Sequence, residues 1–215
     1  MSSLTLTATE NIATDRLLSI YYSATPSQRY AGLTWYNEAR EFISVVAQKF
    51  ELPTHIVAAV IAVTSPRKGW GANKDIAYQL CEMYTQHATE EDVLALKGTF
   101  RTNLTKAWNL LNMPEDGNVY DYVRGPKVTA FYANLLGIDS ALTLDTHALN
   151  AWAGHTDRIS WSKKELTQAE EDYRNAASRT DVTVAQFQAI IWVVWRERIM
   201  SPATVAQHDT SKIAS

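Results

Sequence analysis

The sequence has little cysteine, glycine or proline and no long apolar run, and each shortage excludes a class of protein. Its one cysteine, Cys81, cannot form a disulfide within the chain or build a zinc site from thiolates. Eight glycines and six prolines leave little room for disordered linkers. No stretch approaches the roughly 20 apolar residues of a membrane span, and the N-terminus lacks the features of a signal peptide. We therefore expect a cytoplasmic monomer with no membrane partner.

An excess of positive charge is also lacking. The chain has 20 Lys and Arg against 23 Asp and Glu, a formal net charge of −3. Affinity for duplex DNA comes largely from basic side chains that displace phosphate counterions, so this composition argues against strong nonspecific DNA binding. Any contact with DNA must come from a local basic segment. The sequence has two such segments, Arg67-Lys68 and Arg124-Gly125-Pro126-Lys127.

A helical spacing of apolar residues runs through almost the whole chain, and no stretch shows the alternation typical of a strand. The sequence therefore predicts an all-α fold. Residues 55–64 include IVAAVIAV, which is apolar on every side, so we expect them to form the central helix of the core. Other helices are expected at 10–23, 33–50, 73–86, 100–112, 119–124, 127–136, 145–153, 161–178 and 184–200, with a short one after Thr89.

Two loops between these helices carry candidate functional residues. Residues 65–71, SPRKGWG, contain one proline and two glycines and are predicted to be an exposed loop that presents Arg67, Lys68 and Trp70. Near residue 125, two short helices meet at a glycine-bearing turn. Backbone N–H groups at such a turn, beside a helix N-terminus, can bind a phosphate oxygen, and Gly125 lets a DNA backbone approach closely.

The second turn lies in the most informative segment, VYDYVRGPKVTAFYANLLGIDSALTLDTHALNAW at 119–152. This segment resembles the endonuclease III branch of the helix-hairpin-helix DNA glycosylases, whose hairpin carries a catalytic lysine and whose catalytic aspartate follows in a V-D-T-H motif. Here LTLDTH places Asp145 at the aspartate position and Lys127 at the lysine position, 18 residues apart (145 − 127). Upstream, AAVIAVTSPRKGWGANKDIAYQL and LKGTFRTNLTKAW are also similar to that branch.

The resemblance implies two helical lobes with an active-site cleft between them. The glycosylase-like core would span 54–153, with its hairpin at 119–136. Helices in 1–53 and 154–200 would form the second lobe, and 201–215 would be a loose tail. Two departures stand out: the hairpin keeps only one of its usual two glycines, followed directly by Pro126, and the branch's cysteine cluster is absent.

The resemblance also implies roles for particular residues. A base must be flipped out of the duplex before an enzyme can reach its sugar bond, and the 65–71 loop would fill the gap that it leaves. Asp145 would stabilise positive charge on the sugar, and Lys127 would attack C1′ and form a Schiff base. The expected DNA contacts are Gly125, Arg124, Val128, Arg67, Lys68 and Trp70. We expect DNA as the partner, with neither a cofactor nor a metal.

Other interpretations stay open. The same flipped-base pocket could serve phage-type hypermodification, in which an amine or amino acid displaces pyrophosphate from a hydroxymethylpyrimidine-derived base; the short, cluster-free chain resembles phage proteins in style. A noncatalytic DNA-binding module is a third possibility. Taken alone, Asp145 is typical of a helix N-cap and Lys127 of a surface lysine. The tryptophans at 152, 192 and 195 have the spacing of core residues.

Overall fold

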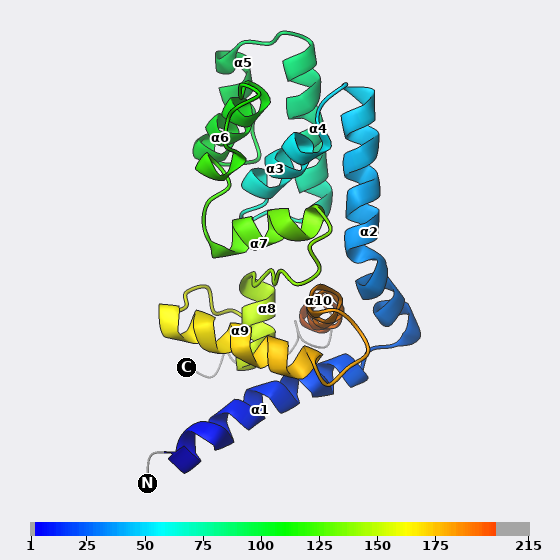
Figure 1. Cartoon of the computed structure of the whole chain (residues 1–215), viewed down its shortest axis with the longest axis vertical. Helices are drawn as coiled ribbons and strands as arrows, with labels where there is room; N and C mark the ends of the chain where they lie inside the picture. Colours follow the sequence, from blue (N-terminus) through cyan, green and yellow to red (C-terminus); the bar gives the residue numbers. More distant parts are fainter. Residues whose placement is uncertain (1–2, 201–215) are drawn as a thin grey trace, which may run out of the picture. The chain divides into compact units, whose positions relative to one another are not determined.

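A computed structural model describes residues 3–200, with side chains from Ile12 to Ile199, and every regular element in this range is a helix (Figure 1). The predicted all-α class is confirmed. The α-helices are α1 (Ser3–Tyr22), α2 (Pro26–Lys49), α3 (Thr54–Thr64), α4 (Trp70–Thr85), α5 (Glu90–Leu94), α6 (Arg101–Leu111), α7 (Pro126–Leu135), α8 (Thr146–Ala153), α9 (Lys163–Ala177) and α10 (Val184–Met200); a 3-10 turn, η1, spans Val119–Asp121.

The helices cluster into two compact units. The central unit is Tyr36–Ile138, and the terminal unit combines the described parts of Met1–Trp35 and Asp139–Ser215. The core predicted at 54–153 is divided between them, since 139–153 cluster with the terminal unit. The tail predicted at 201–215 lies outside the described residues.

The central unit is built around α3. Every residue of this helix from Ile56 to Thr64 is buried, and α3 packs against α4, α6 and α7. A helix that is apolar on all sides is removed from water only if other helices pack around it, as they do here. The prediction that this helix is central is confirmed. Its polar last residue, Thr64, has its hydroxyl 2.9 Å from Oδ1 of buried Asn73, whose Nδ2 donates to the Ile61 carbonyl at 3.1 Å. These contacts tie α3 to α4.

The terminal unit buries one face each of α1, α8, α9 and α10. Tyr21, Tyr173 and Phe187 are the largest side chains of its core. Gly32, at the start of α2, is required for close packing here, because a Cβ at that position would lie 2.6 Å from the Cα of Ile190. The terminal unit thus has its own apolar core, independent of α3.

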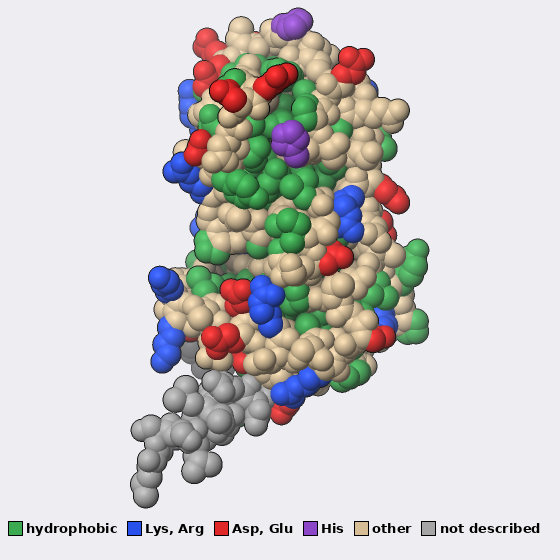
Figure 2. Space-filling view, in the orientation of Figure 1, with side chains coloured by type: hydrophobic (Ala, Val, Ile, Leu, Met, Phe, Trp, Pro, Cys, Tyr) green, Lys and Arg blue, Asp and Glu red, His purple; other side chains and the backbone are tan. Residues whose placement is uncertain are grey.

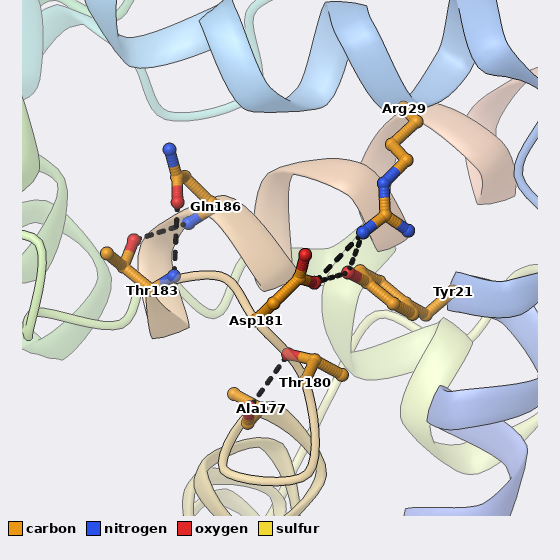
Figure 3. A network of polar contacts seen from close by, with 7 residues as sticks. All are labelled: Tyr21, Arg29, Ala177, Thr180, Asp181, Thr183 and Gln186. Atoms are coloured by element: carbon orange, nitrogen blue, oxygen red, sulfur yellow. Dashed lines mark hydrogen bonds and ion pairs between the residues drawn. The ribbon is translucent and has the colours of Figure 1, made fainter.

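A polar network anchors the loop between α9 and α10 (Figure 3). Asp181 Oδ1 accepts from the Tyr21 hydroxyl at 3.1 Å and from Arg29 Nη2 at 3.0 Å, and the Arg29 guanidinium lies 4.6 Å from the centre of the Tyr21 ring. Thr183 and Gln186 exchange two further hydrogen bonds at the start of α10. Burial is the main cause that raises the pKa of Tyr21, and the hydrogen bond to Asp181 adds to it. The pKa of Asp181 is lowered, first by a hydrogen bond with the backbone of Asp181 and then by the bond from Tyr21.

Several helix boundaries differ from those predicted. Helix α2 begins at Pro26, not near residue 33, because proline suits the first turn of a helix, where its missing N–H is not needed. Helix α4 begins at Trp70, so the loop predicted at 65–71 is shorter. The helix predicted at 119–124 is only the 3-10 turn Val119–Asp121. The first two differences fall at helix ends, and the third replaces a whole predicted helix by a single turn.

Candidate functional site

Lys127 lies in the first turn of α7, in the central unit. Its Nζ donates a hydrogen bond to Ser65 Oγ at 2.5 Å, although the two residues are 62 positions apart in sequence. The ammonium also lies 4.9 Å from the centre of the Phe131 ring, one helical turn further on. Lys127 is half-buried. Its side chain is therefore held from two sides and does not extend into solvent as a surface lysine would.

Ser65 connects this lysine to the end of α3. It caps the C-terminus of α3, is only 7% exposed, and donates its own hydroxyl proton to the Ala62 carbonyl at 2.9 Å. The C-terminal end of a helix carries partial negative charge, which attracts the ammonium of Lys127. The sequence predicts a loop at Ser65 and no functional role, because nothing in its local sequence indicates its partner.

The segment after Ser65 carries the other predicted DNA contacts of this region. Arg67 is exposed and has a left-handed backbone, φ 58°, and its guanidinium carbon lies 5.9 Å from the centre of the Phe100 ring. Lys68 is half-buried. Trp70 is not in the loop but begins α4, and its ring packs edge-on against Phe42 at 6.3 Å. Trp70 is thus held by aromatic packing on the helix.

The turn before α7 has the geometry that the sequence indicated. Gly125 is the N-cap of α7 with φ 96° and ψ 144°, a conformation open essentially to glycine alone, and a Cβ placed there would meet no atom within 4 Å. The first N–H groups of α7 lack intrahelical acceptors, as in any helix. Arg124 is exposed and pairs with Asp121 at 3.5 Å, while Val128 is half-buried. The turn can therefore offer backbone and side-chain donors to an anion.

Asp145 lies in the terminal unit and is the N-cap of α8. Its Oδ1 accepts from the Ala148 backbone N–H at 2.8 Å, as the capping interpretation predicts. Its Oδ2 accepts from the indole Nε1 of Trp192 at 2.9 Å, across 47 positions in sequence. Capping uses only one of the two oxygens. The second bond fixes the rotation of the half-buried carboxylate, and a simple cap has no need of this.

Aromatic and basic side chains surround Trp192. Its ring makes edge contacts with Trp35 at 6.2 Å and with His147 at 6.4 Å, and the Arg196 guanidinium lies 4.6 Å from its centre. Trp192 is only partly buried, so it is not the core residue that its spacing suggested. The negative charge of Asp145, after burial, helps raise the pKa of Tyr173 well above its ordinary value. Asp145 thus lies in a largely aromatic setting.

The structure brings some of the predicted residues together. Lys127, Gly125, Arg124 and Val128 share one turn in the central unit, and the bond to Ser65 joins that turn to the segment with Arg67, Lys68 and Trp70. Asp145 belongs to the terminal unit, with Trp192 and His147.

Comparison with known proteins gives a family. Residues 2–199 match a group described as "Family of unknown function (DUF7178)". The chain belongs to this family. No curated protein and no solved structure is significantly similar to it.

Two further properties of this DUF7178 protein concern its described residues only. They contain no cluster of three or more His, Cys, Asp or Glu side chains able to hold a metal ion. No single described helix is long and apolar enough to cross a membrane; one bent pair, Pro26–Phe50 with Thr54–Thr64, meets that test by length and composition alone.

Proposed function

We propose that this DUF7178 protein is a DNA glycosylase that removes a damaged or modified base flipped out of DNA. The observation that carries the proposal is the hydrogen bond between Lys127 and Ser65. It joins two segments that the sequence analysis assigned to DNA contact separately, the glycine turn before α7 and the basic segment after α3. Because Lys127 and Ser65 are 62 positions apart in the sequence, their bond shows that the fold brings these two segments next to each other.

The gathered segments supply what a DNA-binding edge needs. Backbone N–H groups at the start of α7 can bind a phosphate oxygen, and Gly125 leaves room for the backbone of the DNA. Arg124 and Arg67 are exposed and can add charge-assisted bonds to phosphates. Such local donors offset the net charge of −3, which gives no general attraction to DNA.

Asp145 has the properties of the carboxylate that such a reaction requires. Breaking the bond between base and sugar develops positive charge on the sugar, and a fixed carboxylate stabilises that charge without having to reorganise. The bonds from Ala148 and Trp192 fix both oxygens of Asp145, while each oxygen keeps lone-pair capacity for another contact. The same carboxylate can accept a proton from the attacking nucleophile.

Lys127 decides which kind of glycosylase this is. As an ammonium hydrogen-bonded to Ser65, Lys127 can only bind an anion such as a DNA phosphate, and water would then attack the sugar. If Lys127 loses a proton, its amine can attack C1′ and displace the base. The C1′–O4′ bond then opens, O4′ takes up a proton, and the Schiff base that results permits strand cleavage by β-elimination. We propose Lys127 as the nucleophile.

The test combines base release with trapping of the covalent intermediate. Oligonucleotides with different modified pyrimidines are incubated with the protein, released bases are identified by mass spectrometry, and borohydride is added to reduce any Schiff base. We expect base release that Asp145→Asn abolishes and a protein–DNA adduct that Lys127→Ala abolishes. Lys163→Ala and Asp157→Asn, both at exposed positions, serve as matched controls and should behave as wild type.

Other outcomes assign other functions. Base release without an adduct gives a glycosylase that uses water. Transfer of an amine to a pyrophosphorylated base, with neither release nor adduct, gives the hypermodifying enzyme. DNA binding without any product, unchanged by Asp145→Asn, overturns the enzymatic proposal and leaves a binding module.

A further inference from the structure

The central unit contains an open pocket that the proposed reaction does not use. Its volume is about 740 Å³, within the range of small-molecule sites. It is formed by the C-terminal ends of α2, α4 and α6 and the start of α3, and its lining includes neither Lys127 nor any predicted DNA contact. The proposed reaction therefore does not account for this pocket.

The walls of this pocket expose polar and apolar surface in roughly equal parts, and much of the apolar part is aromatic. Phe50, Tyr84 and Trp108 line it together with Ile56 and Met113. Tyr84 and Trp108 meet edge to face, with ring centres 6.0 Å apart and planes at 73°. Such a wall can hold a flat apolar body, and aromatic faces also attract a cation.

Two residues in an unusual backbone conformation stand at the rim. Glu51 has φ 52° and His87 has φ 57°, and both line the pocket. Each follows the end of a helix, where the next N–H closes the turn by bonding five residues back, from Leu52 to Ala47 and from Ala88 to Met83. Glycine is the residue preferred at such positions because a side chain there is strained. Helices α2 and α4 are thus followed by Glu51 and His87, both beside the same pocket, at positions where glycine would be less strained.

A carboxylate lines the pocket. With histidine counted as neutral, Glu51 is the one charged side chain among the lining residues. Lys49 is hydrogen-bonded to the Tyr78 hydroxyl, and its ammonium lies 4.7 Å from the centre of the Tyr78 ring and 5.2 Å from the centre of the Phe50 ring, which lines the pocket. Figure 2 shows hydrophobic side chains gathered over α3, with Asp and Glu side chains above them near α5. Coulomb attraction to Glu51 favours a positively charged group on the Glu51 side of the pocket.

We infer that this pocket binds a small organic cation with an aromatic or branched apolar body. The apolar part lies against Tyr84 and Trp108, and the positive group faces the carboxylate of Glu51. His87 and Asn112 supply polar groups at the opening. The inference is independent of the proposed reaction, since it shares no residue with that site.

Three probes that share a benzyl group and differ in charge test the inference: benzyltrimethylammonium, benzyl alcohol and phenylacetate. Binding is followed in ¹H–¹⁵N NMR spectra through the indole N–H of Trp108, with the indole of Trp192 as an internal reference. We expect the cation to bind with a Kd of about 1 mM, as its size allows. The neutral and anionic probes should bind more weakly, and the Trp192 signal should not move.

Variants of Glu51 separate ligand binding from structure. Glu51→Gln should weaken the cation about fivefold, the effect of one exposed charge pair, while the matched Glu41→Gln on α2 changes nothing. Glu51→Gly should raise the thermal midpoint of unfolding, because glycine adopts the left-handed backbone without strain. It should nevertheless weaken binding of the cation about as much as Glu51→Gln does. Binding of phenylacetate as tight as that of the cation, unchanged affinity in both variants, or no probe binding at about 10 mM overturns the inference.

Discussion

The indole N–H of Trp192 donates to the free oxygen of Asp145 at 2.9 Å and thereby connects α10 to the N-cap of α8. A cap needs one carboxylate oxygen, and Ala148 already occupies it. The second bond therefore fixes the rotation of the carboxylate. In the proposed reaction the carboxylate stabilises positive charge that develops on the sugar, and small displacements of such a group slow a reaction strongly.

Replacing Trp192 by phenylalanine tests this relationship. Trp192→Phe keeps an aromatic ring but removes the N–H donor together with part of the ring, so base release should fall about 10- to 100-fold while stability falls by about 1 kcal/mol. Trp195→Phe is the matched control, since the Trp195 Nε1 is buried and has no hydrogen-bond partner among the described residues. Trp195→Phe loses the same volume from a ring packed against the core, so it should lower stability by a similar amount and leave base release unchanged. Equal losses of activity in the two variants would show that the bond to Asp145 has no role.

The second prediction concerns the hydroxyl that holds Lys127. Ser65→Ala should reduce the rate of borohydride trapping about tenfold, because the lysine loses its fixed position. Ser178→Ala is the control. Ser178 caps α9 as Ser65 caps α3, and each donates to the carbonyl three residues back at 2.9 Å. Ser65→Ala should lose more stability in urea unfolding than Ser178→Ala, because Ser65 is buried and Ser178 is exposed, and only Ser65→Ala should slow trapping.

Much of the fold follows from local sequence. The apolar sequence of α3 predicts a helix buried on all sides, and Gly125-Pro126 predicts a break followed by a helix start. The positions of Lys127 and Asp145 at two helix N-termini follow from the same local patterns. What these predictions share is that each depends on neighbours within a few residues.

The partners of these residues could not be predicted in this way. Ser65 and Trp192 contact the two candidate catalytic side chains across 62 and 47 positions, and their local sequences suit a loop and a core helix. The start of α4 at Trp70 was also missed, because two glycines near it indicate a loop although the tertiary packing of Trp70 on Phe42 supports a helix. Long-range packing decides such cases, and a single sequence does not contain it.

The third prediction concerns Gly125. Alanine there meets no neighbour within 4 Å, so its cost comes from the backbone, about 1–3 kcal/mol for a residue forced to φ 96° and ψ 144°. Gly137, after the other end of α7, has φ 90° and equally open surroundings. We expect both Gly125→Ala and Gly137→Ala to lower stability, and only Gly125→Ala to weaken DNA binding, by about tenfold. Equal DNA affinity of the two variants would exclude a phosphate contact at Gly125.

The fourth prediction is a dependence of stability on pH that comes from Glu165. Its carboxylate accepts from the Ser162 backbone N–H at 2.8 Å and from the Ser162 hydroxyl at 2.7 Å, and it pairs with Arg158. These contacts, led by the backbone bond, lower the pKa of Glu165 from 4.5 to about 2. The folded state therefore binds this proton less readily than the unfolded state. The charge of Glu165 thus stabilises the fold above pH 4.5, and its contribution is lost as the pH falls towards 2.

Glu165→Gln isolates this charge, because glutamine can still accept from the N-cap backbone in a capping box. The urea midpoint of wild type should exceed that of Glu165→Gln at pH 7, and the difference should shrink between pH 4.5 and about 2 and then vanish. Glu171→Gln, on an exposed part of the same helix, should follow the wild-type profile throughout. A difference between wild type and Glu165→Gln that stays constant from pH 7 to 2 would show that the charge of Glu165 does not contribute, and that only the shape of its side chain matters.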